Sequence, residues 1–438
     1  MTQRRSIFGL DFLLIAATLA LMVMGVLFIY SSGVSSTGVV FSNEYIKQIV
    51  WAVSGIILMV VVGMSDYSRL RDWSFYIYAF LMFLLVVTLV VGKRVYGARS
   101  WLGLLHAGIG IQPSEFAKIG TILLLGSWLA SNRERAQRLS TFVVAFLITL
   151  LPMLLILVEP DLGTALVYFP IFVIMTYVAG AKRRHVMFVL LSAALLVLLT
   201  TLSYLKDLQQ SASTSMIELA LQHSFLHHVA LAILAVIAVS LIGLYFFKRR
   251  YFYWITWAFS SILTSIIGTL AVTKVLKPYQ VMRLVSFLDP QIDPRGSGWN
   301  IIQSVTAVGS GGFFGKGFLH GTQSHYHYIP QQSTDFIFSI FSEEWGFVGG
   351  LALFSLFLVI FIRGLRIVAA TKDPYAAYIG SGVVGMIFFH FTVNVGMAMG
   401  IMPITGIPLT FLSYGGSALW TALIGIGLLV NIHYRRYY

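Results

Sequence analysis

The sequence predicts an all-α polytopic membrane protein of about twelve transmembrane helices. Three observations predict this class. Hydrophobic residues make up 58% of the 438 residues and charged residues only 10%, and the mean hydropathy is +0.86, which lies far outside the composition of soluble globular proteins. Apolar stretches of bilayer-spanning length recur along the whole chain. Short basic runs separate them.

Twelve apolar stretches have the length of a spanning helix, roughly 20 residues. The first follows a basic start but has no small-residue cleavage site after it, so we interpret it as a retained helix and not as a signal peptide. The stretch 116–131 is short, and 206–227 can hold a helix that lies on the membrane surface. The twelve stretches are residues 12–30, 46–64, 74–92, 116–131, 141–158, 164–180, 185–205, 228–247, 253–275, 337–362, 376–400 and 410–432.

The basic residues predict the orientation. The chain has 29 Lys and Arg and a formal net charge of +13, but these residues do not cluster as in a nucleic-acid-binding domain, so we expect no nucleic-acid partner. With both termini cytoplasmic, every basic run lies on the cytoplasmic side, as the positive-inside rule requires. The runs are Arg4-Arg5, Arg69/Arg71, Arg133/Arg135/Arg138, Lys182-Arg183-Arg184, Lys248-Arg249-Arg250, Arg363/Arg366/Lys372 and Arg435-Arg436.

We interpret residues 1–438 as a single integral-membrane domain. The orientation places its longest hydrophilic segment, 277–334, outside the cytoplasm together with 92–115, and loops of this length are usually functional. No internal repeat is visible, which argues against a transporter built from paired repeats. The absence of cysteine excludes disulfides and thiol catalysis.

The glycine-rich stretch GSGGFFGKG, Gly309 to Gly317, looks like a phosphate-binding loop but does not match its motif. G-x-x-x-x-G-K-[ST] needs glycines and a hydroxyl at fixed positions. Here Ser310 stands at the first glycine position, and Gly317 follows Lys316 where Ser or Thr is required. We therefore predict no nucleotide site.

Several of the 16 acidic residues stand at the predicted outer ends of helices, where a charge is costly and suggests a function. Asp335 follows Ser333-Thr334 and precedes an apolar run. It can cap that helix, or it can act as a general base at the water boundary for a substrate brought in from the membrane. The other acids of interest are Glu115, Glu159, Asp161, Asp289, Asp293, Glu343 and Glu344.

These other acids also have structural explanations. Asp161 can cap the helix that follows it, and Glu115 falls in the first turn of a helix. Glu343 and Glu344 lie within an apolar run, where we expect them to pair with a basic residue or to line a water-filled cavity.

Histidines and basic residues on the predicted outer side are candidate ligands. His320, His325 and His327 include a His-x-His pair, but no third ligand of suitable spacing accompanies it, so we predict no metal site formed by these histidines. An anionic ligand such as a diphosphate would explain basic residues that run against the positive-inside bias, and so would anionic lipid headgroups. These residues are Lys93, Arg94, Arg99, Lys118, Arg295 and Lys316.

Six motifs follow one another along nearly the whole chain. They are QPSEFAK at 112–118, EPDLGT at 159–164, LDPQIDPRGSGWNIIQS at 288–304, GSGGFFGKGFLHGTQS at 309–324, STDFIFSIFSEEWG at 333–346 and PLTFLSYGGS at 408–417. Together they resemble the SEDS proteins (shape, elongation, division and sporulation), and GKGFLHGTQS looks more like the RodA branch than the FtsW branch. One motif alone would be weak evidence, but six in order are specific.

The resemblance implies a SEDS-like helical bundle and a peptidoglycan glycosyltransferase that polymerises lipid II at the outer face of the bacterial cytoplasmic membrane. A class B penicillin-binding protein would be its partner and would crosslink the strands. The aspartate of the family's T-D-F-I-F motif is its proposed catalytic residue, and it matches Asp335. The implied reaction is attack of a GlcNAc 4-hydroxyl on the donor's anomeric carbon, with inversion and with undecaprenyl diphosphate as the leaving group.

Charge and position then select residues for the diphosphate, which a divalent cation, Mg²⁺ or Mn²⁺, can help to bind. No other cofactor is expected. The expected substrate and diphosphate contacts are Arg99, Lys118, Lys316, Glu115, Asp161 and Gln323.

Two features depart from the family. SEDS proteins typically have ten transmembrane helices, so we interpret 185–275 as a region with an extra helix pair, inserted as a hairpin that keeps the topology. Many relatives have a basic residue directly before the Trp of a G-A-x-x-W motif, whereas here Ser100 precedes Trp101 and the charge is at Arg99. Two other functions stay open on the sequence: a flippase or transporter of a lipid-linked precursor, and a non-catalytic scaffold of a wall-synthesis complex.

Overall fold

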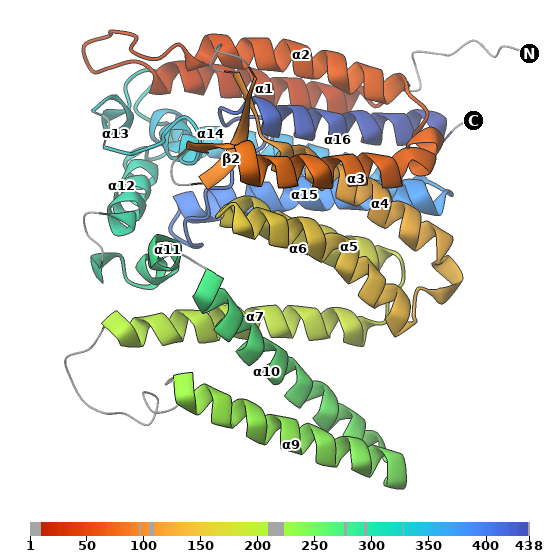
Figure 1. Cartoon of the computed structure of the whole chain (residues 1–438). Helices are drawn as coiled ribbons and strands as arrows, with labels where there is room; N and C mark the ends of the chain where they lie inside the picture. The colour runs from red at the N-terminus through yellow and green to blue at the C-terminus, as the bar shows by residue number, and fades with distance from the viewer. Residues whose placement is uncertain are drawn as a thin grey trace, which may run out of the picture. The chain divides into compact units, whose positions relative to one another are not determined.

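The computed structural model describes residues 10–95, 98–104, 109–208, 223–275, 278–292, 296–326 and 328–436. The chain forms two compact units, one of Met1–Ala181 with Asp293–Tyr438 and the other of Lys182–Ile292. Helices dominate both units (Figure 1).

The described residues of the larger unit form long helices, several short helices and a three-stranded sheet. Its elements are α1 (Phe12–Ser32), α2 (Glu44–Met64), α3 (Tyr67–Val91), β1 (Lys93–Val95), β2 (Ala98–Leu104), β3 (Ile109–Ile111), α4 (Pro113–Ser131), the 3₁₀ helix η2 (Arg133–Arg135), α5 (Leu139–Val158), α6 (Leu162–Val178), α12 (Ser297–Ser310), α13 (Thr322–His325), α14 (Ile337–Ala370), α15 (Pro374–Ala398) and α16 (Gly416–Arg435).

The described residues of the smaller unit form three long helices and a short one. They are α7 (Arg183–Leu208), α9 (His223–Phe247), α10 (Arg250–Val275) and α11 (Pro278–Leu288), followed by the 3₁₀ helix η3 (Pro290–Ile292). Ile233 and Ile237 of α9 pack against Ile266 of α10. The hydroxyl of Ser265 donates to the carbonyl of Ser192 at 3.0 Å and so joins α10 to α7. This unit contains the region 185–275, where an extra helix pair is predicted.

Each of the twelve predicted spans overlaps a helix of the structure, which confirms the all-α class. Among the described residues, ten helices are long and apolar enough to cross a membrane. The other two are α4, whose first two turns contain a Glu and a Lys, and α6, which has 17 residues. The predicted boundaries differ most at the end of α14, which extends to Ala370 and not to residue 362, and at the start of α3, which begins at Tyr67 and not at residue 74. Helix α16 begins at Gly416 and not at residue 410 because residues 399–415 form a partly buried loop.

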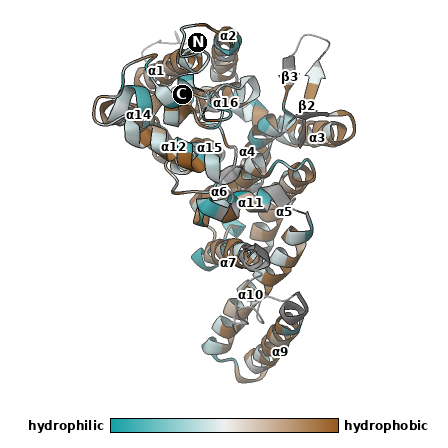
Figure 2. Ribbon diagram, turned by 90° about the vertical axis from the view of Figure 1, so that its left-hand side faces the viewer, coloured by the Kyte–Doolittle hydropathy of each residue, from teal (hydrophilic) through white to brown (hydrophobic). Residues whose placement is uncertain are grey.

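The apolar surfaces of the long helices fit a lipid environment (Figure 2). On α2, Val50, Val53, Ile57, Val60 and Val61 are all exposed. Contiguous apolar surface of this kind indicates contact with lipid, because its exposure to water would be unfavourable. The chain is therefore a multi-pass membrane protein.

Helices α15 and α16 form the centre of the larger unit. Their apolar spans are 72% and 78% buried, against 17% for α2. Glycines allow close contact here: an added Cβ at Gly427 would lie 2.7 Å from the carbonyl oxygen of Met59 on α2, and one at Gly382 would lie 2.7 Å from the sulfur of Met175 on α6. Small residues at helix contacts are the usual means of tight packing in a bilayer.

Two segments expected as loops contain regular structure. Between α3 and α4, β2 pairs antiparallel with β1 and with β3, and the order of the sheet is β1-β2-β3. The polar segment 277–334 contains α11 in the smaller unit and α12 and α13 in the larger one. Short polar elements of this kind lack the long apolar periodicity that reveals a spanning helix.

Candidate active site

Asp335 lies in a tight turn directly before α14. The amide groups of Thr334 and Asp335 donate to the carbonyl oxygen of Gln331 at 3.3 and 3.1 Å, and Gln331 itself has a positive φ of 50°. The N-cap residue of α14 is Phe336, so Asp335 does not occupy the capping position that was one of its two interpretations. Its side chain is half-buried.

A buried amide on α15 holds the backbone of Asp335. The side-chain nitrogen of Asn394 donates to the carbonyl oxygen of Asp335 at 2.9 Å and to that of Ile407 at 2.8 Å. Asn394 is 0% exposed, so water does not compete for these bonds, and they are stronger than they would be at a surface. One side chain thus joins the turn before α14 to the loop 399–415.

The same loop makes two more bonds to this turn. The hydroxyl of Ser413 donates to the carbonyl oxygen of Thr334 at 2.6 Å, and the amide of Tyr414 donates to that of Ser333 at 2.8 Å. The Ser413 hydroxyl also accepts from the amide of Leu409 at 2.8 Å, which fixes the loop itself. We call the bonds from Asn394, Ser413 and Tyr414 the Asp335 clamp.

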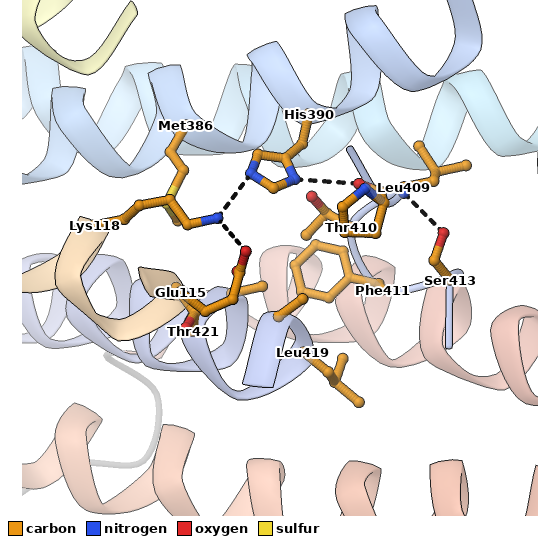
Figure 3. Close-up of a pocket in the computed structure, with 13 residues that line it drawn as sticks. Glu115, Lys118, Met386, His390, Leu409, Thr410, Phe411, Ser413, Leu419 and Thr421 are labelled. Carbon is orange, nitrogen blue, oxygen red and sulfur yellow. Dashed lines mark hydrogen bonds and ion pairs between the residues drawn. The ribbon is translucent and has the colours of Figure 1, made fainter. Parts of the chain in front are cut away.

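A buried ion pair lies on α4 close to this loop (Figure 3). The Nζ of Lys118 is 2.8 Å from Oε1 of Glu115, and the two side chains are 1% and 4% exposed. On α15, Nε2 of His390 lies 3.3 Å from Nζ of Lys118, and its Nδ1 lies 3.1 Å from the carbonyl oxygen of Pro408. We infer that Nδ1 carries the proton and donates to the carbonyl, while Nε2 accepts from the lysine.

These groups line a small cavity together with the loop that forms the clamp. Pro408, Leu409 and Ser413 contribute to its wall, and its volume is about 20 Å³, which has room for roughly one water molecule. The charge of Lys118 is therefore directed at Glu115 and this cavity. The loop connects the buried pair to the turn that contains Asp335.

Asp161 caps α6, as its structural explanation predicts. Its Oδ1 accepts from the amide of Thr164 at 3.0 Å, and its Oδ2 accepts from the Thr164 hydroxyl at 2.8 Å. Oδ2 also accepts from the side-chain nitrogen of Gln112 at 2.9 Å, and the amide of Gln112 donates to the hydroxyl of Ser417 at 3.0 Å. Three motifs far apart in the sequence, QPSEFAK, EPDLGT and PLTFLSYGGS, thus meet.

Glu159 is a second acid of the EPDLGT motif and has a different environment. It follows the last residue of α5 and is 0% exposed. Burial, and secondly the charge of Asp161, raise the pKa of Glu159 to about 8. The side chain is therefore mainly protonated at neutral pH.

Glu343 binds the loop that follows the glycine-rich stretch. Its Oε1 accepts from Nζ of Lys316 at 2.7 Å, from the amide of Thr322 at 2.8 Å and from that of Gln323 at 3.1 Å. Glu343 is fully buried, whereas the side chain of Lys316 is 28% exposed. The expectation that Glu343 pairs with a basic residue is confirmed.

The glycine-rich stretch packs against a break in α14. Gly346, in the first third of this helix, has non-helical angles of φ 61° and ψ −156°. The amide of Lys316 donates to the carbonyl oxygen of Glu343 at 3.0 Å. An added Cβ at Gly315 would lie 2.1 Å from the carbonyl oxygen of Glu344. The stretch therefore satisfies backbone groups at a helix break in an apolar environment. This contact explains its glycines without a nucleotide.

Glu344 belongs to a separate hydrogen-bond network. The hydroxyl of Ser31 donates to its Oε1, and the amide of Leu319 donates to its Oε2 at 3.3 Å. Nε2 of His325 is 3.8 Å from Oε1, and Nδ1 of His325 donates to the carbonyl oxygen of Val34 at 2.6 Å. His325 is thus turned into the protein.

Nearly the whole chain matches one protein family. The model of the FtsW/RodA/SpoVE family, described as cell cycle protein, matches residues 11–220 and 227–438. The chain belongs to this family. It is 50% identical over 436 residues to a protein of Treponema pallidum (strain Nichols) named peptidoglycan glycosyltransferase RodA, with 99% of both chains covered.

Two further matches extend the relationship within the FtsW/RodA/SpoVE family. Stage V sporulation protein E of Bacillus subtilis (strain 168) is 32% identical over 434 residues, with 98% of both chains covered. A chain in a solved structure is similar with a TM-score of 0.65 and 26% identity over 98% of both chains. That structure is described as the structural coordination of polymerization and crosslinking by a peptidoglycan synthase complex.

The structure groups the predicted site residues of this family member. Glu115 and Lys118 form the buried pair, and the loop beside them holds the turn of Asp335. Lys316 and Gln323 meet on Glu343, two turns further along α14. Asp161 caps α6 and is joined through Gln112 to the start of α4.

Some predicted residues fall outside this description. Arg99 lies on β2, but its side chain is outside the described part of the structure, as are the side chains of Lys93 and Arg94. Asp289 is exposed in the smaller unit and accepts from the amide of Gln291 at 3.0 Å. The residues that lie entirely outside the described ranges are Asp293, Arg295 and His327.

Three residues of the site were missed on the sequence: His390, Asn394 and Ser413. The first two are polar residues in an apolar span, where a polar side chain has a high free-energy cost and is often functional. That signal is present in α15. The sequence does not reveal their partners, because the loop 399–415 that supplies them interrupts the apolar pattern.

Proposed function

We propose that this protein is a peptidoglycan glycosyltransferase that polymerises lipid II at the outer face of the bacterial cytoplasmic membrane. Membership of the FtsW/RodA/SpoVE family and 50% identity to a peptidoglycan glycosyltransferase RodA support this function. The basic runs support the orientation, because they place the turn of Asp335 and the start of α4 on the outer side.

The observation that carries the proposal is the Asp335 clamp. Asn394, Ser413 and Tyr414 each bind the backbone of the Ser333–Asp335 turn. A general base needs a fixed position relative to the hydroxyl that it deprotonates. The clamp gives Asp335 such a position at the outer end of α14.

In the proposed reaction, the carboxylate of Asp335 takes the proton of the acceptor's GlcNAc 4-hydroxyl. The oxygen forms a bond to the donor's anomeric carbon with inversion, and the bond from that carbon to undecaprenyl diphosphate breaks. Partial burial favours this role, because a carboxylate that is incompletely solvated is a stronger base.

Basic residues would bind the diphosphate as it leaves. Lys316 suits this role because it is part-exposed and its partner Glu343 is buried behind it. Lys118 is buried against Glu115 and is not accessible to a substrate, so we assign to this pair, with His390, the task of positioning the loop beside Asp335. Arg99 and the side chain of Gln323 remain proposed contacts of the substrate and its diphosphate. Asp161 supports the site as the cap of α6.

A divalent cation stays a prediction. Within the part of the chain that the structure describes, no three His, Asp or Glu side chains form a group suited to hold a metal ion. No step of the proposed reaction is therefore assigned to a cation.

A class B penicillin-binding protein is the proposed partner. The solved relative belongs to a complex that coordinates polymerisation and crosslinking, and a transpeptidase would supply the second activity.

The experiment uses the purified full chain, with this partner, in liposomes that contain labelled lipid II. Glycan polymer is the expected product. Movement of lipid II across the bilayer without polymer would indicate a flippase, and neither product would indicate a scaffold.

A further inference from the structure

A basic cavity lies at the far end of α14 from Asp335. Three helix ends that are distant in the sequence form it: the start of α1, the last turns of α14 and the end of α16. Its volume is about 140 Å³, and it is lined by Asp11, Arg363, Arg366, Ile367, His433 and Arg436.

One arginine of the cavity is held by the only acid in its lining. Asp11 is buried and caps α1 by accepting from the amide of Leu14 at 3.1 Å. Both oxygens of Asp11 also accept from Nε of Arg363, at 3.0 and 2.8 Å. This ion pair forms part of the cavity lining and neutralises the charge of Asp11.

Apart from the Asp11–Arg363 pair, the lining contains two arginines, Arg366 and Arg436. With His433 counted as neutral, three arginines and one aspartate give the lining a net charge of +2. Arg366 is exposed and forms no ion pair with any residue in the described ranges. The positive-inside rule accounts for arginines at this end of the helices. It does not account for their convergence on one cavity beside a buried carboxylate.

We propose that this cavity binds a phosphate-bearing anion at the cytoplasmic face. Guanidinium groups bind phosphate oxygens in pairs, and basic pockets between transmembrane helices bind anionic lipid headgroups. The anion comes either from the headgroup of an anionic phospholipid in the inner leaflet or from free phosphate. In both cases it bridges Arg366 and Arg436 and joins the ends of α14 and α16.

The test is a calorimetric titration of the purified full chain in a neutral detergent. The probes are dihexanoyl-phosphatidylglycerol, dihexanoyl-phosphatidylcholine and inorganic phosphate. Wild-type protein is expected to bind the phosphatidylglycerol at least tenfold more tightly than the zwitterionic phosphatidylcholine. Inorganic phosphate that binds as tightly as phosphatidylglycerol would identify free phosphate as the source, and weaker binding would identify the lipid.

The matched variants are Arg366→Gln and Arg69→Gln. Both arginines are exposed, and both lie at the predicted cytoplasmic ends of helices. Arg366→Gln should weaken binding about fivefold, which is the usual effect of one basic residue at an anionic surface. Arg69→Gln should change it less than twofold.

Three results would overturn the proposal: no binding by the wild-type protein, equal binding of the two lipids, or equal weakening by the two variants. Equal weakening would mean that the anion is attracted only by the overall positive charge of this face and does not bind in the cavity. Should Arg366→Gln fail to fold, Arg366→Lys keeps the charge without the paired donors, and it should weaken binding more than Arg69→Lys does.

Discussion

Replacement of Asn394 by alanine tests the Asp335 clamp directly. The change removes one buried nitrogen that donates to two carbonyl oxygens, those of Asp335 and Ile407. A buried polar group left without a partner costs about 1–3 kcal/mol, so the free energy of unfolding should fall by about 2–6 kcal/mol. Polymerisation by the protein that remains folded should fall about 100-fold, the effect expected when a catalytic group shifts by about 1 Å.

The chain offers a matched control in Asn431 on α16. This side chain is also 0% exposed, and its nitrogen donates to the carbonyl oxygens of Val62 and Ser65 at 2.8 and 2.6 Å. Asn431→Ala should therefore destabilise the protein to a similar extent. Its polymerisation rate should not change, because these bonds lie away from Asp335.

Two assays separate the effects. Unfolding in mixed micelles with increasing sodium dodecyl sulfate, followed by circular dichroism, gives the free energy. Polymer formed from labelled lipid II, normalised to folded protein, gives the rate. Equal loss of rate in the two variants, or a normal rate in Asn394→Ala, would refute the reasoning.

Three further predictions use the same unfolding assay. Gly315→Ala should cost about 2–4 kcal/mol, because its Cβ would lie 2.1 Å from a carbonyl of α14 and its φ is +78°. Gly350→Ala, with nothing within 4 Å of the new Cβ, should instead be neutral or stabilise by up to about 1 kcal/mol, and equal effects would contradict the packing. Lys118→Met should cost about 3–5 kcal/mol because Glu115 is left buried without its partner; adding Glu115→Gln should restore most of this, and a fully stable single variant would disprove the pair. The unfolded chain releases the proton of Glu159 near pH 4.5 and the folded chain near pH 8, so the folded state binds more protons between these two values. The free energy of unfolding should therefore fall as the pH rises through this window, by up to about 1.4 kcal/mol per pH unit. A slope that persists in Glu159→Gln would show that another group causes it.

The helices could be predicted from the sequence because their signal is local. Each spanning helix needs a run of apolar residues, and all twelve runs became helices. The break in α14 could not be predicted, because a single glycine such as Gly346 does not reveal its φ. The break depends on the stretch around Gly315, which is far from it in the sequence and supplies the backbone partners.

The site was predictable only in part. Asp335 was recognised from its position between a polar segment and an apolar run, where a charge is costly. The clamp escaped recognition because it joins Asp335 to Asn394 and Ser413 through contacts across the bundle. Lys118 was expected to face an anionic ligand, but Glu115 one turn away binds its charge inside the protein. A sequence shows which charges exist and not which of them neutralise each other.

The most direct test of the account compares Asp335→Asn with the wild-type protein in lipid II binding and in polymerisation. Asparagine keeps the size of the side chain but accepts a proton poorly. Affinity for lipid II should therefore stay within about twofold, while the polymerisation rate should fall about 10²–10⁴-fold, the range that general base catalysis contributes. Polymerisation by Asp335→Asn at the wild-type rate would contradict the central claim that this carboxylate takes the acceptor's proton.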